Sequence, residues 1–225
     1  MKIIFFDTET NGFKGTSVLS ISAIKVDYDE KTNTFKKDGE FNRFYFRNEG
    51  EEVNEEAVSI NGLTDEVIRK EREKLGFEYP ETFKEDMSNF YEFCKDTEHY
   101  VAHNIKFDRD FIDFPLKNQF DTMLANVDIL KLPGKFDDSY KWPRLSECAK
   151  HYKVPIVESD LHGSYYDVLV MFRVFYKMSA DPRTKNDIMD FMGLSKDYNK
   201  KNPGLVSSRW TTLTFRSGRF LAIFC

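Results

Sequence analysis

The stretch KIIFFDTETNG, residues 2–12, contains a run of apolar side chains that stops at two carboxylates. A short apolar run without polar alternation is typical of a strand that is buried on both faces. The carboxylates Asp7 and Glu9 precede Asn11 and Gly12, which form a turn signal, so the strand is expected to end in a loop. Side chains two positions apart in a strand point to the same face, and Asp7 and Glu9 are therefore expected to converge on one spot.

Two carboxylates held this close repel each other strongly at low dielectric unless cations neutralise them. Carboxylate oxygens are the ligands that suit Mg²⁺ or Mn²⁺. The alternative is an ordinary acidic turn after a strand. The same tripeptide recurs as Asp96-Thr97-Glu98 at the end of an amphipathic helix, where we expect only solvated charges. The spacing alone leaves both interpretations open.

The segments on either side of this strand indicate an α/β fold. Residues 18–26 and 41–46 are rich in β-forming side chains and are expected to be the next two strands, joined by an exposed loop over 27–40. Three consecutive strands favour an antiparallel meander. A further buried strand is expected at 100–103. Helical periodicity is expected at 55–60, 64–74, from Pro80 to 94, and at 108–114, 122–130, 145–152 and 165–178.

The composition excludes several classes of protein. The chain has 225 residues, of which 16% are aromatic, so it is not a disordered chain. No apolar run approaches the roughly 20 residues of a membrane span. The three cysteines, Cys94, Cys148 and Cys225, match neither a disulfide framework nor a zinc site, which favours a cytoplasmic protein. The formal net charge of -5 argues against a protein that coats nucleic acid.

The chain is expected to have two parts. Residues 1–180 are expected to form the main domain. Residues 181–225 are expected to be a helical segment followed by a basic, β-prone tail of unknown role. Within that tail, residues 203–225 carry three arginines and no acidic side chain.

Two later motifs contain candidate functional carboxylates. Asp108 follows the buried strand at 100–103, and its alternative role is to cap a helix N-terminus. Asp167 follows His162 by five positions. Its alternative role is to form a capping pair with Ser164, because serine and an acid three residues later are typical of a helix start. Each motif alone leaves a structural role open.

Together, the three motifs resemble the DEDD superfamily of 3′–5′ exonucleases, in its DEDDh branch, which shares the ribonuclease H-like fold. The resemblance covers roughly residues 1–180. The tyrosine branch would need a tyrosine where this chain has Gly163. The motifs match at Asp7-Thr8-Glu9-Thr10-x-Gly12, at His103-Asn104-x-x-Phe107-Asp108-x-x-Phe111 and at His162-x4-Asp167.

The resemblance implies a mixed sheet flanked by helices and a metal-dependent enzyme. Asp7, Glu9, Asp108 and Asp167 would hold two divalent cations, Mg²⁺ or Mn²⁺, and His162 would be the general base. The expected reaction hydrolyses single-stranded nucleic acid, DNA favoured and RNA possible, from the 3′ end to nucleoside 5′-monophosphates. The residues expected to contact substrate are Thr8, Thr10, Gly12, Phe13, His103, Asn104 and Phe107.

Roles in proofreading, DNA repair and RNA trimming stay open, and a polymerase or repair protein in trans is a candidate partner. Two other functions are alternatives: a two-metal phosphoesterase acting on small nucleotides, and a non-catalytic binding module. The binding module would be expected to have lost a carboxylate, yet all four are present. The chain departs from the family at Ser20-Ile21-Ser22, where Glu-Ile-Gly is frequent, and at Asn61-Gly62, where His-Gly is frequent.

Overall fold

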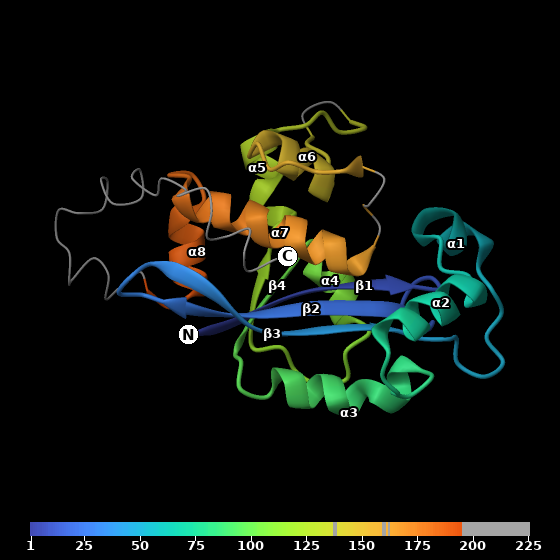
Figure 1. Ribbon diagram of the computed structural model, residues 1–225. Coiled ribbons are helices and arrows are strands. Elements are labelled where there is room, and N and C mark those ends of the chain that lie inside the picture. Colours follow the sequence, from blue (N-terminus) through green and yellow to red (C-terminus); the bar gives the residue numbers. More distant parts are fainter. Residues whose placement is uncertain (137–138, 159–160, 162, 195–225) are drawn as a thin grey trace. The chain divides into compact units, whose positions relative to one another are not determined.

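Figure 1 presents the computed structural model, which describes residues 1–136, 139–158, 161 and 163–194. The chain divides into two compact units, Met1–Phe175 and Tyr176–Cys225. The first unit contains the sheet and all the described candidate site residues. The second contains the end of one long helix and the short helix α8 (Lys185–Phe191), while residues 195–225, with the predicted basic tail, lie outside the described residues.

The first unit is built on a five-stranded mixed sheet with the order β3-β2-β1-β4-β5. The first three strands pair antiparallel, which confirms the predicted meander, and β4 and β5 continue the sheet parallel to β1. This is the predicted α/β architecture. The strands are β1 (Lys2–Thr10), β2 (Val18–Asp29), β3 (Thr34–Phe44), β4 (His99–Ala102) and β5 (Asn118–Asp121).

Strand β3 contradicts one expectation. The predicted exposed loop over 27–40 is largely strand, because β2 continues to Asp29 and β3 already begins at Thr34. The edge position of β3 explains the error, since one side of an edge strand is open to solvent and tolerates lysines and acids. Within β3 only Phe35 and Phe41 are buried, so apolar content alone did not reveal the whole strand.

The segment after β4 also differs from its prediction. The helix expected at 108–114 is instead α4 (Ile105–Arg109), which begins earlier, and strand β5 was not predicted. Asn104 adopts a left-handed conformation with φ 73°, which turns the chain from β4 directly into α4. Strand β5 has four residues, too few to show a clear period.

The other helices lie near their predicted positions. Thr64 and Thr82 cap the N-termini of α2 and α3 with their hydroxyl oxygens, so α3 begins three residues after Pro80 rather than at it. The segment expected to be a helix at 122–130 is a 3-10 turn, η1, followed by one turn of α5. The bounds are α1 (Glu55–Asn61), α2 (Asp65–Leu75), α3 (Phe83–Cys94), η1 (Leu124–Asn126), α5 (Val127–Leu130), α6 (Leu145–His151) and α7 (Ser164–Ala180).

Aromatic side chains hold α7 and α3 on opposite faces of the sheet (Figure 1). Phe5 of β1 packs edge-on against Phe172 of α7, with ring centroids 5.1 Å apart, whereas Phe41 of β3 contacts Phe90 of α3 at 5.2 Å. Side chains in a strand alternate between faces, so the odd-numbered residues that follow Phe5 also face α7. This register places the strand's two carboxylates under the start of that helix.

Two observations bear on the composition. Cys94 and Cys148 are buried free thiols, and Cys225 lies outside the described residues. Across the described part of the chain, no helix combines the length and apolar character needed to cross a membrane.

Candidate active site

Asp7 and Glu9 lie within strand β1 and do not belong to a turn. The strand continues to Thr10, and Asp7 pairs with Ser22 and Glu9 with Ser20 of the neighbouring strand β2. The alternative of an acidic turn is therefore wrong. Both residues are paired in extended backbone, with a register shift only after Glu9, so both carboxylates point to the α7 face.

The third carboxylate of this cluster comes from helix α7. Asp167 lies in the first turn of α7, and one carboxylate oxygen from each of Asp7, Glu9 and Asp167 lies within 4.8 Å of the others. All three side chains are partly exposed, so an ion could reach them. The structure thus brings together residues that are separated by 158 positions in the sequence.

Asp108 is the fourth carboxylate, and it is almost fully buried. Its Oδ1 accepts hydrogen bonds from the backbone N–H of Thr8 at 2.9 Å and from the Thr8 hydroxyl at 2.8 Å. It lies inside α4, where Asn104 is the N-cap residue, so the alternative role of Asp108 as a cap is wrong. Thr8 follows Asp7 in β1 and ties Asp108 to the edge of the cluster.

The pKa values reflect the crowding of these four acids. Burial raises the pKa of Asp7 well above its ordinary range, and the charges of Asp108, Glu9 and Asp167 raise it further. Burial, with the charges of Asp167 and Asp108, raises the pKa of Glu9 to about 8. Burial raises the pKa of Asp108 to about 7 even though the Thr8 hydrogen bonds oppose the shift. Such shifts are characteristic of functional sites.

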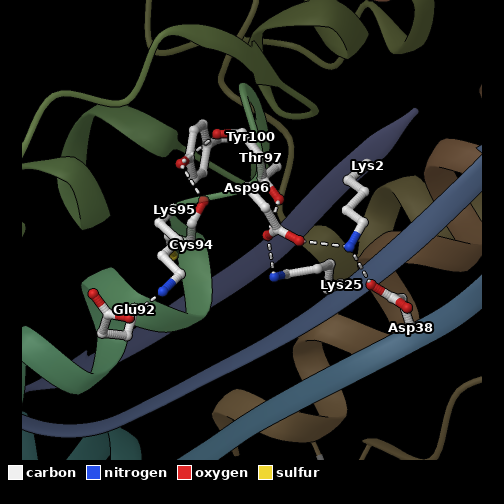
Figure 2. Close-up of polar contacts among 9 residues, drawn as sticks. All are labelled: Lys2, Lys25, Asp38, Glu92, Cys94, Lys95, Asp96, Thr97 and Tyr100. Atoms are coloured by element: carbon white, nitrogen blue, oxygen red, sulfur yellow. Dashed lines mark hydrogen bonds and ion pairs between the residues drawn. The ribbon is translucent and has the colours of Figure 1, made fainter.

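The repeated tripeptide at Asp96 provides a direct comparison. Figure 2 shows that the Asp96 carboxylate lies between Lys2 and Lys25, and the Lys2 Nζ atom is 2.5 Å from it. The hydrogen bonds from these two lysines lower the pKa of Asp96 to about 2. The expectation that Asp96 is merely a solvated charge is therefore wrong. Asp96 lies beside two lysines of the protein, whereas Asp7 lies beside other carboxylates. The pKa of an aspartate is therefore lowered at the first position and raised at the second.

Three buried serines fix the start of α7 and were not foreseen as site residues. The Ser164 hydroxyl lies 2.9 Å from that of Ser20 and 2.7 Å from that of Ser22, and Ser22 also donates to Asn42. Because Ser20 and Ser22 pair with Glu9 and Asp7, the hydroxyl contacts fix the register of Asp167 against the β1 carboxylates. In the sequence, the departure from the family pattern at Ser20-Ile21-Ser22 was the only signal that could have identified these serines.

Asp121 at the end of β5 is a second residue that the sequence analysis missed. Its carboxylate accepts from the backbone N–H groups of Asn104, Ile105, Met123 and Leu124. These bonds hold the left-handed turn that introduces α4. An aspartate directly after a phenylalanine, as Asp7 follows Phe6, was the signal that could have identified it.

The candidate substrate residues lie around this edge of the sheet. His103 is hydrogen-bonded at both ring nitrogens, to the Thr122 hydroxyl and to the Pro143 carbonyl, each at 3.0 Å. Phe107 is half-buried and contacts Phe111. Their contact with a substrate stays a prediction, as it does for Asn104.

Hydrogen bonds hold the loop after β1, and the side chain at its tip is exposed. Asn11 donates to the Glu51 carboxylate at 2.7 Å, and the Thr10 hydroxyl donates to the Gly12 carbonyl at 2.6 Å. A Cβ at Gly12 would lie 3.2 Å from Asn54, which makes a larger residue there crowded. Phe13 at the tip is 84% exposed. The loop can therefore present an aromatic ring at a fixed place beside the carboxylates.

His162 lies outside the described residues, so its predicted role as general base stays a prediction. The other predicted ligands can be tested against the chemistry of a cation site. Asp7, Glu9 and Asp167 offer only oxygen atoms, and burial together with neighbouring carboxylate charges raises the pKa values of Asp7 and Glu9. Such a donor set fits a hard divalent cation.

Comparisons with known proteins agree with this geometry. A family model described as an exonuclease, of the RNase T type, matches residues 4–175. A PolC-type DNA polymerase III from Staphylococcus aureus is 26% identical over 179 residues, which cover 78% of this chain and 11% of the polymerase. This chain thus spans about a ninth of that relative.

Solved exonucleases have the same fold. E. coli exonuclease I in complex with a dT13 oligonucleotide superimposes with a TM-score of 0.60 at 15% identity, covering 84% of this chain and 43% of the exonuclease. Exonuclease X in complex with 5′ overhanging duplex DNA gives 0.51 at 18% identity, covering 85% and 93%. The chain therefore belongs to the RNase T-type exonuclease family, with the carboxylate pattern of the DEDDh 3′–5′ exonucleases.

Proposed function

We propose that this chain hydrolyses single-stranded nucleic acid, with DNA favoured, from the 3′ end and releases nucleoside 5′-monophosphates. The observation that carries the proposal is the cluster of Asp7, Glu9 and Asp167, with ligand oxygens within 4.8 Å of one another, in a chain of the exonuclease family. DNA is favoured because the 26% identical relative is a DNA polymerase and because the exonuclease I structure holds a DNA oligonucleotide.

Two Mg²⁺ or Mn²⁺ ions, held by Asp7, Glu9, Asp108 and Asp167, would supply a nucleophilic hydroxide and neutralise charge on the scissile phosphate. The protein contributes the preformed arrangement of the acids. Strand β1 presents Asp7 and Glu9 on one face, Ser164 sets the start of the helix that brings Asp167, and Thr8 orients Asp108. Because these groups are held before substrate arrives, little reorganisation is needed on binding.

His162 is proposed to take the proton of the attacking water at its imidazole nitrogen. Histidine suits this role because its ordinary pKa of ~6.5 lies near neutral pH. We expect His162→Ala to lower kcat by a factor of 10² to 10⁴. Metal affinity should stay within twofold, as measured by titration. A loss of metal affinity with kcat per loaded enzyme unchanged would contradict the general-base role.

The terminal nucleotide is proposed to lie between the loop after β1 and helix α4. Thr8, Thr10 and Gly12 would approach it with backbone atoms, Phe13 and Phe107 would offer apolar surface to a base, and His103 and Asn104 would shape the turn beside it. Base stacking on aromatic rings tolerates any sequence, which suits a degradative enzyme.

The decisive experiment follows a 5′-labelled 20-nucleotide single strand with Mg²⁺, run in parallel as DNA and RNA. A descending ladder with release of 5′-monophosphates is expected. Asp7→Asn should stop the ladder, whereas Asp113→Asn, which removes an exposed carboxylate of the same type, should not. No ladder on either substrate would reject the proposal.

A phosphoesterase acting on small nucleotides is the competing function. It predicts turnover of a mononucleotide phosphoester at a rate equal to or above that of the oligonucleotide.

The similarity to a polymerase also suggests proofreading or repair in trans. That partnership predicts co-elution of the full chain with a purified DNA polymerase in gel filtration.

A further inference from the structure

The segment between α5 and α6 forms a small hairpin, described at residues 131–136 and 139–144 and called here the basic–aromatic hairpin. Gly134 donates from its backbone to the Ser139 carbonyl at 2.9 Å, and Lys141 donates to the Leu132 carbonyl at 3.0 Å. A Cβ at Gly134 would lie 2.2 Å from the Ser139 hydroxyl oxygen, so glycine permits the close approach of the two sides. The backbone is thus held in a defined shape.

Three large rings on this hairpin are turned to solvent. Phe136 is 80% exposed, Trp142 is 65% exposed and Tyr140 is 44% exposed. The rings fall within seven consecutive positions, on a chain whose other aromatic side chains largely fill the core. Exposed apolar surface concentrated in this way marks an interaction site.

Cationic side chains alternate with these rings. Lys131, Lys135, Lys141 and Arg144 are all exposed, and the Lys131 ammonium lies 5.9 Å from the centre of the Tyr140 ring. With two aspartates, residues 131–144 have a net charge of +2 in a chain of -5. Rings that stack on bases, together with cations that attract phosphates, suit a single-stranded nucleic acid.

The hairpin is fastened to the same edge of the sheet as the carboxylates. The Pro143 carbonyl accepts a hydrogen bond from His103 Nε2 at 3.0 Å, and the other ring nitrogen of His103 contacts Thr122 after β5. Burial lowers the pKa of His103, so the ring is neutral and donates from Nε2. His103 is followed by Asn104, the N-cap residue of α4, and Asp108 lies four positions further along, a rise of about 6 Å in a helix. The base of the hairpin therefore lies close to the site.

We propose that the basic–aromatic hairpin binds the substrate strand a few nucleotides upstream of its 3′ end. This inference rests on the proposed function, because the strand's 3′ end is taken to lie at the Asp7 cluster. The alternating cations argue against a purely apolar protein partner, since burying them against such a surface would leave their charges uncompensated. The hairpin would make the enzyme prefer strands over dinucleotides.

The first test measures binding without turnover. The Kd of the full chain for 5′-fluorescein-labelled dT12 is determined by anisotropy in EDTA, where no cleavage is expected. Phe136→Ala/Trp142→Ala should raise the Kd about tenfold or more. Phe136→Tyr/Trp142→Phe, which keeps the ring faces, should stay within threefold of the wild type. Equal Kd values for all three proteins would overturn the proposal.

The second test removes charge. Lys135→Ala/Arg144→Ala should weaken binding and reduce the slope of log Kd against log salt by about 1.4, since each phosphate contact to a single strand contributes ~0.7. The matched control is Lys36→Ala/Lys84→Ala, which removes two exposed lysines on β3 and α3 and should leave the slope unchanged. The same slope in both double variants would count against the hairpin.

Turnover distinguishes this inference from the proposed function. With Mg²⁺, Phe136→Ala/Trp142→Ala should raise the KM for dT12 at unchanged kcat and leave both constants for dT3 unaltered. If the wild type degrades neither strand, the proposed function fails, while the binding measurements in EDTA still decide the hairpin. If the wild type is active and the variant has the same KM for dT12, only the hairpin inference fails.

Discussion

The hydroxyl of Thr8 donates a hydrogen bond of 2.8 Å to Asp108, a carboxylate 100 positions away in the chain. The backbone N–H of Thr8 binds the same oxygen at 2.9 Å. This contact joins β1 to α4, so it also joins the first of the three sequence motifs to the second. It stabilises the ionised form of a buried acid whose environment otherwise favours the proton.

Thr8→Val should therefore destabilise the protein in a pH-dependent way. The substitution keeps the shape and the backbone N–H donor but removes the hydroxyl donor, so the pKa of Asp108 should rise further above about 7. A hydrogen bond to a charged group contributes about 1.5–3 kcal/mol, and most of this loss is expected at pH 9, where Asp108 is ionised. Urea unfolding at pH 5 and pH 9 measures it. Thr8→Ser, which keeps the hydroxyl, should have the wild-type free energy of unfolding at both pH values. An equal loss of stability for Thr8→Val at pH 5 and pH 9 would contradict the interpretation.

The metal-free protein should lose stability as the pH rises from about 4 to 8. The pKa of Glu9 is raised from 4.5 to about 8 and that of Asp108 from 3.8 to about 7, so the folded state binds more protons than the unfolded state in this window. Stability from these groups is complete below their unfolded values and is lost as the pH passes through the folded ones. Unfolding in EDTA across this range measures the trend.

Divalent cations should reverse that trend. Mg²⁺ should raise the free energy of unfolding more at pH 8.5 than at pH 5, because ligands must be deprotonated to bind metal. Asp7→Asn/Glu9→Gln should reduce the pH dependence in EDTA to the part that Asp108 contributes, and it should abolish the response to Mg²⁺. A wild-type protein that becomes more stable between pH 5 and 8 in EDTA would refute the assigned pKa directions.

Ser164→Ala should weaken metal binding by displacing Asp167. The substitution removes hydroxyl contacts of 2.9 Å and 2.7 Å and leaves Ser20 and Ser22 buried, at a cost of about 1–3 kcal/mol. The control is Ser179→Ala on the same helix, whose buried hydroxyl donates to the Tyr176 carbonyl. Both variants should lose stability, but calorimetric titration should find lower Mg²⁺ affinity for Ser164→Ala alone. Equal affinities would reduce Ser164 to a packing role.

Asp96→Asn tests the ion-pair cluster of Figure 2. The pKa of Asp96 is lowered to about 2, so its contribution is present above its ordinary value of 3.8 and is lost as the pH falls toward 2. Its side chain is 42% exposed, and screening limits the loss to about 1 kcal/mol at pH 7. Glu92→Gln, which breaks an exposed pair with Lys95, should cost almost nothing. Equal losses in the two variants would show that the burial of Lys25 adds nothing.

Local sequence patterns were sufficient to predict the elements whose burial shows in their own residues. The apolar character of β1 and α7 and the periodicity of α3 predicted these elements, because each leaves its own local pattern of buried side chains. The first part of the edge strand β3, residues 34–40, and the short strand β5 were missed because pairing partners distant in the chain stabilise them. Helix α4 was misplaced because its start depends on Asp121, 17 positions after Asn104.

The sequence by itself determined the family, the meander and the identity of the acids, since motif order and strand parity are properties of the chain. Only the tertiary structure decided what those acids do. Asp7 and Asp96 belong to identical tripeptides, yet the pKa of one is raised by carboxylates and burial and that of the other is lowered by lysines. A charge responds to its neighbours in space at distances of a few ångströms. The sheet and α7 bring those neighbours together, and no local pattern in the sequence encodes this meeting of distant residues.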